Sequence, residues 1–191
     1  MPVVAATNAI VELVDAKGYI KYESTADDDI IQNIINGVSS LFEKYCGSKF
    51  INLAITEVVD GSGTQIQIVE YCPITALTEI KFYFDTATPV IQTITDFIFD
   101  GPAGMIKGKT GGFPEGWQNI QIIYTAGYGA NIAALPDDLK LAAMKQCEFY
   151  YKRDAADFSA TFEEGMLIKT PAELLSPVVL GMLSPYYHAR F

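Results

Sequence analysis

Residues 103–110 (AGMIKGKT) have the spacing of a phosphate-binding loop: a small residue, four variable positions, then Gly108, Lys109 and Thr110. Such loops bind phosphates because backbone N–H groups and a lysine surround them where a strand passes into a helix. Four helix-breaking residues follow directly, namely Gly111, Gly112, Pro114 and Gly116. We therefore expect no nucleotide site at Lys109, and instead turns around one short strand at residues 105–107.

Two acidic runs and a single histidine are the other candidates for chemistry. Residues 27–29 are three aspartates. Consecutive helical residues diverge by about 100°, so these carboxylates cannot converge on one ion and we expect a charged helix start. Glu163 and Glu164 have no evident partner for acid–base catalysis, and His188 lacks the nucleophile and the acid of a catalytic triad. The sequence predicts no enzyme, no catalytic or metal-binding residue and no cofactor.

The composition predicts a packed domain with a negatively charged surface. Half of the 191 residues are hydrophobic, 12% are aromatic, and the formal net charge is −10. An acidic protein is poorly suited to gripping nucleic acid phosphates. Cys46, Cys72 and Cys147 are odd in number and widely spaced, which favours buried, reduced thiols. No leader peptide and no membrane-spanning run is evident, so we expect folding in a cytoplasm.

Residues 1–50 have helical periodicity. We expect a short helix at residues 13–20 and a longer one within residues 25–47, with Thr25 as its N-cap and Gly47 as its C-terminal stop. The apolar residues of the longer helix recur at helical spacing and predict a buried stripe of Ile30, Ile34, Val38, Leu41 and Tyr45.

Residues 51–126 have the alternation and the β-branched, aromatic composition of strands. Residues 60–63 (DGSG) separate two apolar runs and predict a hairpin. Further strands are expected at residues 79–84, 89–94, 96–99 and 119–125. No helices alternate with these strands, which argues against a doubly wound nucleotide-binding fold.

Residues 127–191 return to helical periodicity. Pro136 is expected as the first residue of a helix that ends near Arg153, with Asp137 and Asp138 at its positive start. Its predicted buried stripe is Leu139, Ala143, Cys147 and Tyr150. A short helix then precedes an aromatic, basic C-terminus.

These three zones predict an α+β fold. Residues 1–50 and 127–191 are expected to form a small bundle of N-terminal and C-terminal helices. Residues 51–126 are expected to form an antiparallel β-rich insertion between them, and the whole chain, residues 1–191, a single domain.

Four segments in a fixed order carry a resemblance to a known family. They are LVDAKGYIKY, DDDIIQNIINGVSSLFEKYCGSKF, NIQIIYTAGYGANIAALPDDLKLAAMKQCEFYYKRD and LLSPVVLGMLSPYYHARF. Their order is similar to that of the head–tail connector (adaptor or head-completion) proteins of tailed double-stranded DNA bacteriophages. The motifs describe a fold rather than chemistry. The middle of this chain is long for the family, and its C-terminal end is less basic than many family tails.

The resemblance implies a structural virion protein at the head–tail interface. Such proteins form a homo-oligomeric ring, here expected to be twelve-fold, beneath the portal protein. The ring extends the DNA channel, through which DNA passes without sequence-specific binding, and provides the attachment surface for the tail or a stopper (head-completion) protein. No membrane is involved, and synthesis takes place in the host bacterial cytoplasm.

The resemblance implies that the C-terminal segment reaches a neighbouring copy or the portal, and the predicted interface residues are Tyr186, Tyr187, Arg190 and Phe191. Tyr and Arg are the residue types that dominate the hot spots of protein interfaces. The alternative is that this segment folds back on the core of its own domain.

A second functional hypothesis is a β-rich binding module that recognises a glycan or a protein. It requires exposed aromatic side chains such as Tyr83, Phe113 and Trp117 to form a platform on residues 51–126. The competing interpretation is that these aromatic side chains fill the core.

Overall fold

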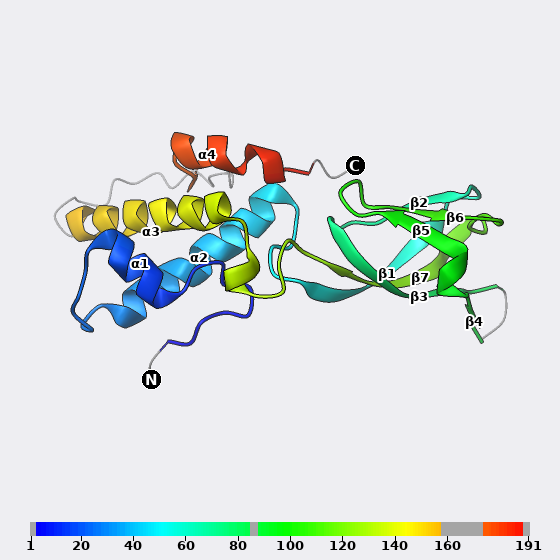
Figure 1. Ribbon diagram of the computed structural model, residues 1–191, viewed down its shortest axis with the longest axis horizontal. Coiled ribbons are helices and arrows are strands. Elements are labelled where there is room, and N and C mark those ends of the chain that lie inside the picture. Colours follow the sequence, from blue (N-terminus) through cyan, green and yellow to red (C-terminus); the bar gives the residue numbers. More distant parts are fainter. Residues whose placement is uncertain (1–2, 85–87, 158–173, 189–191) are drawn as a thin grey trace, which may run out of the picture. The chain divides into compact units, whose positions relative to one another are not determined.

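The computed structural model describes residues 3–84, 88–157 and 174–188. The chain divides into two compact units (Figure 1). The helical unit is built from the chain up to residue 51 and from residue 129 onward, and the β unit consists of residues 52–128. Helices therefore stand at both ends of the sequence and two antiparallel sheets in its middle, which confirms the predicted α+β class.

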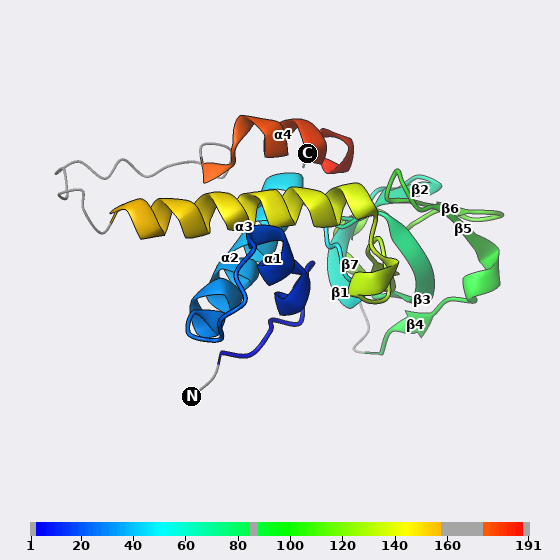
Figure 2. The ribbon, with the colours of Figure 1, turned by 60° about the vertical axis from the view of Figure 1, so that its left-hand side comes forward.

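The helical unit is organised around its longest helix, α3 (Figure 2). Its α-helices are α1 (Leu13–Ile20), α2 (Asp28–Cys46), α3 (Asp137–Asp157) and α4 (Pro177–Leu183). Helix α3 packs against each of the other three. Two short 3₁₀ turns, Ile132–Ala134 and Ser184–Tyr186, lie before α3 and after α4. No described helix is both long enough and apolar enough to cross a membrane.

The buried face of α2 differs by one position from the predicted stripe. Ile30 is 50% exposed, whereas the residues one position later are buried. The apolar buried residues of α2 are Ile31, Ile35, Val38, Phe42 and Cys46. The prediction was correct at Val38 and wrong at the other four positions, because the helix carries two adjacent apolar columns and its periodicity suits both. The N-terminal segment selects the second column, since Ile10 is buried and its N–H donates to the buried Ser39 hydroxyl (3.2 Å).

The ends of the helices follow local signals in most places. Gly47 ends α2 with a φ of 68°, which confirms the predicted stop. Thr25 is not its N-cap, because α2 begins at Asp28 and the Thr25 carbonyl only accepts a bond from the Asp28 N–H (3.3 Å). Lys21 ends α1 with a φ of 61°, a left-handed conformation that is unfavourable for a residue with a Cβ.

Helix α3 begins directly after Pro136, whose carbonyl accepts from the Lys140 N–H (3.2 Å). It continues to Asp157, one turn beyond the predicted end near Arg153. Of its predicted stripe, Leu139, Ala143 and Cys147 are fully buried and Tyr150 is partly exposed.

The β unit contains two antiparallel sheets. The larger has the order β1-β7-β3-β4, and its strands are β1 (Leu53–Gly61), β7 (Gly116–Ala126), β3 (Ile74–Phe82) and β4 (Val90–Ile91). The smaller has the order β2-β6-β5, and its strands are β2 (Ile66–Ile68), β6 (Met105–Gly108) and β5 (Phe97–Asp100). The first and last strands of the unit are neighbours, with Leu53 opposite Ala126.

Residues 60–63 do not form the predicted hairpin. Strand β1 pairs with β7 and strand β2 with β6, so this turn carries the chain from one sheet to the other. The Ser62 hydroxyl donates to the Ile66 carbonyl (2.8 Å) and stabilises the turn. The predicted strand at 89–94 is also shorter than expected, since β4 has two residues and is followed by a 3₁₀ turn, Ile94–Asp96.

Both sheets contribute to one apolar core. Its buried residues are Val69, Ile74, Ile80, Phe82, Ile106, Phe113, Ile120, Ile122, Tyr124 and Ala126. Alternate residues of β7 face it, which explains the strong period-two pattern of that segment.

Candidate interface surfaces

The segment that resembles a phosphate-binding loop is a strand. Residues 105–108 form β6, which lies between β2 and β5, and the chain then passes into β7 without a helix. The Lys109 ammonium donates to the Thr95 carbonyl (2.6 Å), and the backbone N–H of Lys109 donates to the Asp96 carbonyl (2.8 Å). The predicted short strand between turns is confirmed, and Lys109 binds its own chain.

The three aspartates at the start of α2 bind three different partners. Asp27 accepts from the Tyr151 hydroxyl (2.8 Å), Asp28 pairs with the Lys17 ammonium (2.5 Å), and Asp29 accepts from the N–H of residue 3 (2.7 Å). The bond to Asp27 raises the pKa of Tyr151 to about 12. The carboxylates therefore diverge, as predicted, and connect the start of α2 to α1, α3 and the N-terminal segment.

The three cysteines are buried free thiols, as predicted. Burial raises the pKa of Cys46 and of Cys147 to about 12, so both sulfurs stay protonated and unreactive near neutral pH. Burial lowers the pKa of His188, whose backbone N–H donates to the Cys46 carbonyl (2.9 Å). Glu163 and Glu164 lie outside the described residues. Within the described part of the chain, no three His, Cys, Asp or Glu side chains are grouped so that they could hold a metal ion.

The two tyrosines of the predicted C-terminal interface have different environments. Tyr186 is 6% exposed, its ring meets the Phe50 ring edge-on at 6.2 Å, and its hydroxyl donates to the Asp138 carboxylate (2.6 Å). Tyr187 is 52% exposed, and its ring lies 5.5 Å from the Tyr45 ring. Arg190 and Phe191 lie outside the described residues. Tyr186 therefore fixes the segment to its own unit, and Tyr187 is available on the surface.

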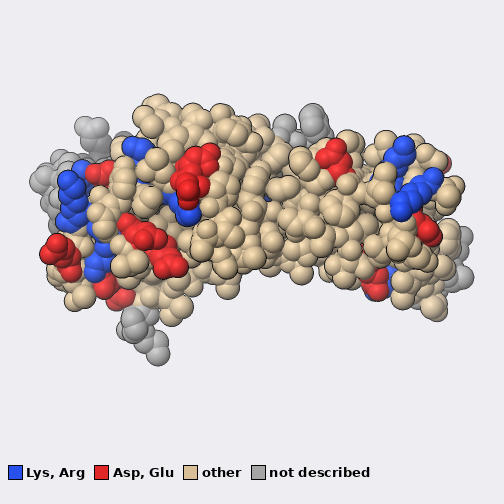
Figure 3. Space-filling model, viewed as in Figure 1, with Lys and Arg blue, Asp and Glu red and all other residues tan. Residues whose placement is uncertain are grey.

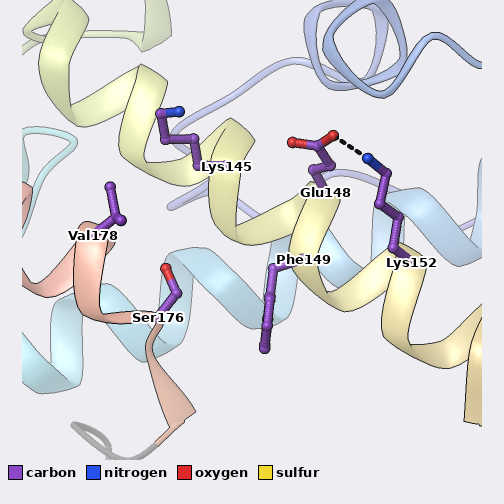
Figure 4. A pocket seen from close by; sticks show the side chains of 6 residues that line it. All are labelled: Lys145, Glu148, Phe149, Lys152, Ser176 and Val178. Atoms are coloured by element: carbon purple, nitrogen blue, oxygen red, sulfur yellow. Dashed lines mark hydrogen bonds and ion pairs between the residues drawn. The ribbon is translucent and has the colours of Figure 1, made fainter.

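A groove of about 480 Å³ lies between α3 and the start of α4 (Figure 4). Its lining residues are Lys145, Glu148, Phe149, Lys152, Ser176 and Val178. Phe149 and Val178 are substantially exposed, while Glu148 pairs with Lys152 (2.6 Å). Beside the groove, the buried Gln146 amide donates to the Leu174 carbonyl (3.2 Å) and accepts from the Ser176 N–H (3.1 Å). These two hydrogen bonds attach the segment that leads into α4 to helix α3.

The three aromatic side chains named for the binding-module hypothesis do not share one exposed platform. Phe113 is in the core, and the Tyr83 hydroxyl lies 3.4 Å from the Gln121 side chain. Of the three, only Trp117 is highly exposed, at 79%. The next residue, Gln118, has a φ of 45°, and its N–H donates to the Asp60 carboxylate (2.7 Å).

The β unit contains a hydrogen-bonded network that we did not predict from the sequence. The Tyr124 hydroxyl is buried in the core, donates to Glu57 (2.7 Å) and accepts from the Tyr71 N–H (3.2 Å). The Glu57 carboxylate also accepts from the Glu70 N–H (3.1 Å). Burial and the bond to Glu57 raise the pKa of Tyr124 far above its usual range. A signal was present, since Glu57 stands between Ile55 and Val59 on the core-facing side of β1.

The charged residues show no single binding patch on the face of the helical unit drawn in Figure 3, where acidic and basic side chains of the described residues are interspersed. Among the described residues of this unit, Lys140 pairs with Asp137 (2.7 Å) and Lys49 with Glu43 (2.9 Å). The face drawn therefore lacks the continuous basic surface of a nucleic-acid-binding protein.

Comparison with solved structures finds the same fold in gene transfer agent particles. A chain from the neck of an empty particle, computed with C6 symmetry, has a TM-score of 0.67 and 16% identity, and the match covers 100% of this chain and 96% of that chain. A chain from the neck of a native particle, computed with C12 symmetry, gives 0.66 and 16% with the same coverage. A chain from the native virion gives 0.64 and 15%, again with the same coverage. At these identities the likeness shows the fold.

The family itself is shown by the sequence. No curated protein matches the chain. The model of the head completion protein family matches residues 9–189, which includes both segments of the helical unit and the whole β unit. The chain therefore belongs to the head completion protein family.

Proposed function

We propose that copies of this chain form a ring in the neck of a phage-like particle. The ring lies beneath the portal, extends the DNA channel and offers a surface to which the tail or a stopper protein attaches. The observation that carries the proposal is the match of the whole chain to neck proteins of gene transfer agents, together with membership of the head completion family. The neck of one such particle was computed with C12 symmetry, which supports twelve copies.

The negative net charge of the protein supports its proposed place in the wall of the DNA channel. With a net charge of −10, the ring repels the phosphates of DNA and lets the duplex pass without sequence-specific binding. The role needs no catalysis. In this proposal the chain acts as one connector domain, residues 1–191, with residues 51–126 inserted between its helical segments. It is made in the bacterial cytoplasm and incorporated at the head–tail interface of the virion.

The C-terminal segment supplies a contact with the portal or with a neighbouring copy. Tyr186 holds the segment on the helical unit, and the exposed Tyr187 is presented beside it. In this proposal Arg190 and Phe191 contribute to the same contact. Anchoring of this kind reduces the entropy that binding would otherwise lose.

Electron microscopy of the protein mixed with the portal protein of the same genome, beside each component alone, tests the function. We expect an additional ring of density on one end of the portal in the mixture only. A portal that stays bare at high concentrations of the protein would contradict the proposal. Deletion of residues 189–191 should weaken this binding and leave the melting temperature of the free protein unchanged.

A further inference from the structure

The larger sheet of the β unit ends in a long strand with an open edge. In the order β1-β7-β3-β4, β1 is outermost and has nine residues. Among the described residues, no backbone group outside β7 hydrogen-bonds to the backbone of residues 53–60. In an antiparallel pair every second residue directs its N–H and C=O away from the partner strand. Strand β1 therefore presents a row of unpaired backbone groups.

The opposite edge of the same sheet is also open, at β4. Ile91 lies opposite Lys81, and the N–H of Gln92 donates to the Ile80 carbonyl (2.8 Å). Because hydrogen-bonded positions alternate, the N–H and C=O of Ile91 point away from β3. Val90 and Ile91 are 48% and 62% exposed, so this edge has apolar side chains beside its free backbone groups.

The two edges carry only part of the usual protection, since β4 is short and follows Pro89, and Glu57 points inward from β1. Proteins discourage strand addition with lysine, proline, bulges or a covering segment. Strand β1 (LAITEVVDG) contains no lysine and no proline, and its one irregularity lies at its end, between Val59 and Gly61. Leu53 and Val58 are about half exposed. The long edge of β1 therefore has neither a lysine nor a proline to discourage strand addition along its outward-facing backbone.

The directions of the strands fit a ring. All three pairs in the sheet are antiparallel, so β1 and β4 run in opposite directions. Neighbouring copies in a ring of many subunits are related by a small rotation, so β1 of one copy and β1 of the next run in nearly the same direction. Strand β4 of one copy is then antiparallel to β1 of its neighbour, which is the more stable pairing. The two edges are also different surfaces, as a closed head-to-tail contact requires.

We propose that neighbouring copies of this chain join edge to edge, with β4 of one copy paired to β1 of the next, so that the sheet continues from subunit to subunit. The inference rests on the ring proposed above and specifies its subunit contact. Val58 lies on the outward face of the sheet because its neighbour Val59 faces the core. Ile91 lies on the same face because its partner on β3, Lys81, stands between Ile80 and Phe82, which both face the core. Pairing covers both exposed side chains along with the free backbone groups.

Cysteine pairs on the outward face test the contact. We would combine Ile91→Cys with Ala54→Cys, Thr56→Cys or Val58→Cys in three full-length variants, which together scan the register. Opposite residues on paired strands have Cβ atoms about 4.5–5.5 Å apart, which is near the range that a disulfide spans. The native thiols are buried and do not compete. After assembly on the portal and mild oxidation, we expect one variant to give a ladder of covalent multimers.

The outcomes separate the contact from the ring. The single variants should give no covalent products, because a head-to-tail contact does not bring a residue beside its own copy. Covalent dimers from a single variant would instead indicate like edges meeting, against the proposal. Rings visible by electron microscopy without a ladder from any pair would refute the edge contact and leave the ring standing. The absence of rings in every sample would refute both.

A proline substitution provides a second test. Ile91→Pro removes an N–H that points away from β3, so the bonds between β3 and β4 and the melting temperature of the free protein should be retained. We expect this variant to lose ring assembly. The matched control, Ile91→Thr, keeps the N–H and should still assemble. Normal rings from Ile91→Pro would contradict strand pairing at β4.

Discussion

Tyr186 and Tyr187 are adjacent in sequence but differ in burial, which makes them a matched pair for measuring what holds the C-terminal segment. Tyr186 is 6% exposed and packs on Phe50, and its hydroxyl binds Asp138 at 2.6 Å. Tyr187 is 52% exposed. We expect Tyr186→Ala to destabilise the helical unit strongly and Tyr187→Ala to change its stability little.

The magnitudes follow from these contacts. Loss of a buried aromatic side chain costs about 3–5 kcal/mol. A hydrogen bond to a charged group contributes about 1.5–3 kcal/mol, and the lower end applies because Asp138 is exposed. Tyr186→Phe isolates that second contribution. For a chain of this size, 1 kcal/mol shifts the melting temperature by about 2–4 °C, so Tyr186→Ala should lower it by about 6 °C or more. Tyr187→Ala should lower it by less than about 2 °C.

Thermal and urea unfolding followed by far-UV circular dichroism measure these differences, because the signal is dominated by the helices. Two results would refute the reasoning. Equal destabilisation by Tyr186→Ala and Tyr187→Ala would mean that Tyr186 is not buried as described. If Tyr186→Phe lowered the free energy of unfolding as much as Tyr186→Ala, the hydroxyl, and not the packing of the ring, would hold the segment.

Three further predictions concern stability and thiol chemistry. Tyr124→Phe should destabilise the protein by about 1.5–3 kcal/mol in urea unfolding, because it leaves a carboxylate and a backbone N–H of the β unit without their shared partner; an unchanged midpoint would contradict this. Lys21→Gly should stabilise the protein by about 1 kcal/mol and Gly47→Ala should destabilise it by a similar amount, since both positions have positive φ; the same sign for both would refute the argument from backbone conformation. Burial raises the pKa of Cys46 and Cys147 from 9.0 to about 12, so these thiols ionise at lower pH in the unfolded chain than in the folded protein. Their contribution to the free energy of unfolding is therefore complete below about pH 9 and declines between about pH 9 and 12. A thiol reagent at about pH 8 should label both only after unfolding, and rapid labelling of the native protein would contradict their burial.

The elements that could be predicted from the sequence are those specified by local signals. Helix α1 has the bounds expected from its pattern. Gly47 ends α2 in a left-handed backbone conformation, which glycine adopts without strain. The face of α2 could not be predicted in the same way. Its columns at Ile30 and Ile31 have equal periodicity, and the choice between them is made by the N-terminal segment that packs on Ser39.

Pairing between distant strands was also beyond local patterns. The turn at residues 60–63 has the composition of a hairpin, yet the partner of β1 is β7, which is more than fifty residues away in sequence. The candidate surfaces depend on the same non-local information. Nothing in the sequence distinguishes Tyr186 from Tyr187, because the difference lies in Phe50 and Asp138, which only the folded chain brings to Tyr186.

The β unit begins and ends at one place. Because Leu53 lies opposite Ala126, the chain leaves the helical unit and returns to it through points about 4.8 Å apart, the spacing of neighbouring strands. Any segment that bridges this short gap preserves the path of the helices, whether it is a tight turn or a whole domain. Lineages can therefore lengthen, shorten or exchange this part of the gene while the helical scaffold stays constant. The same position suits the display of a foreign domain whose termini are adjacent.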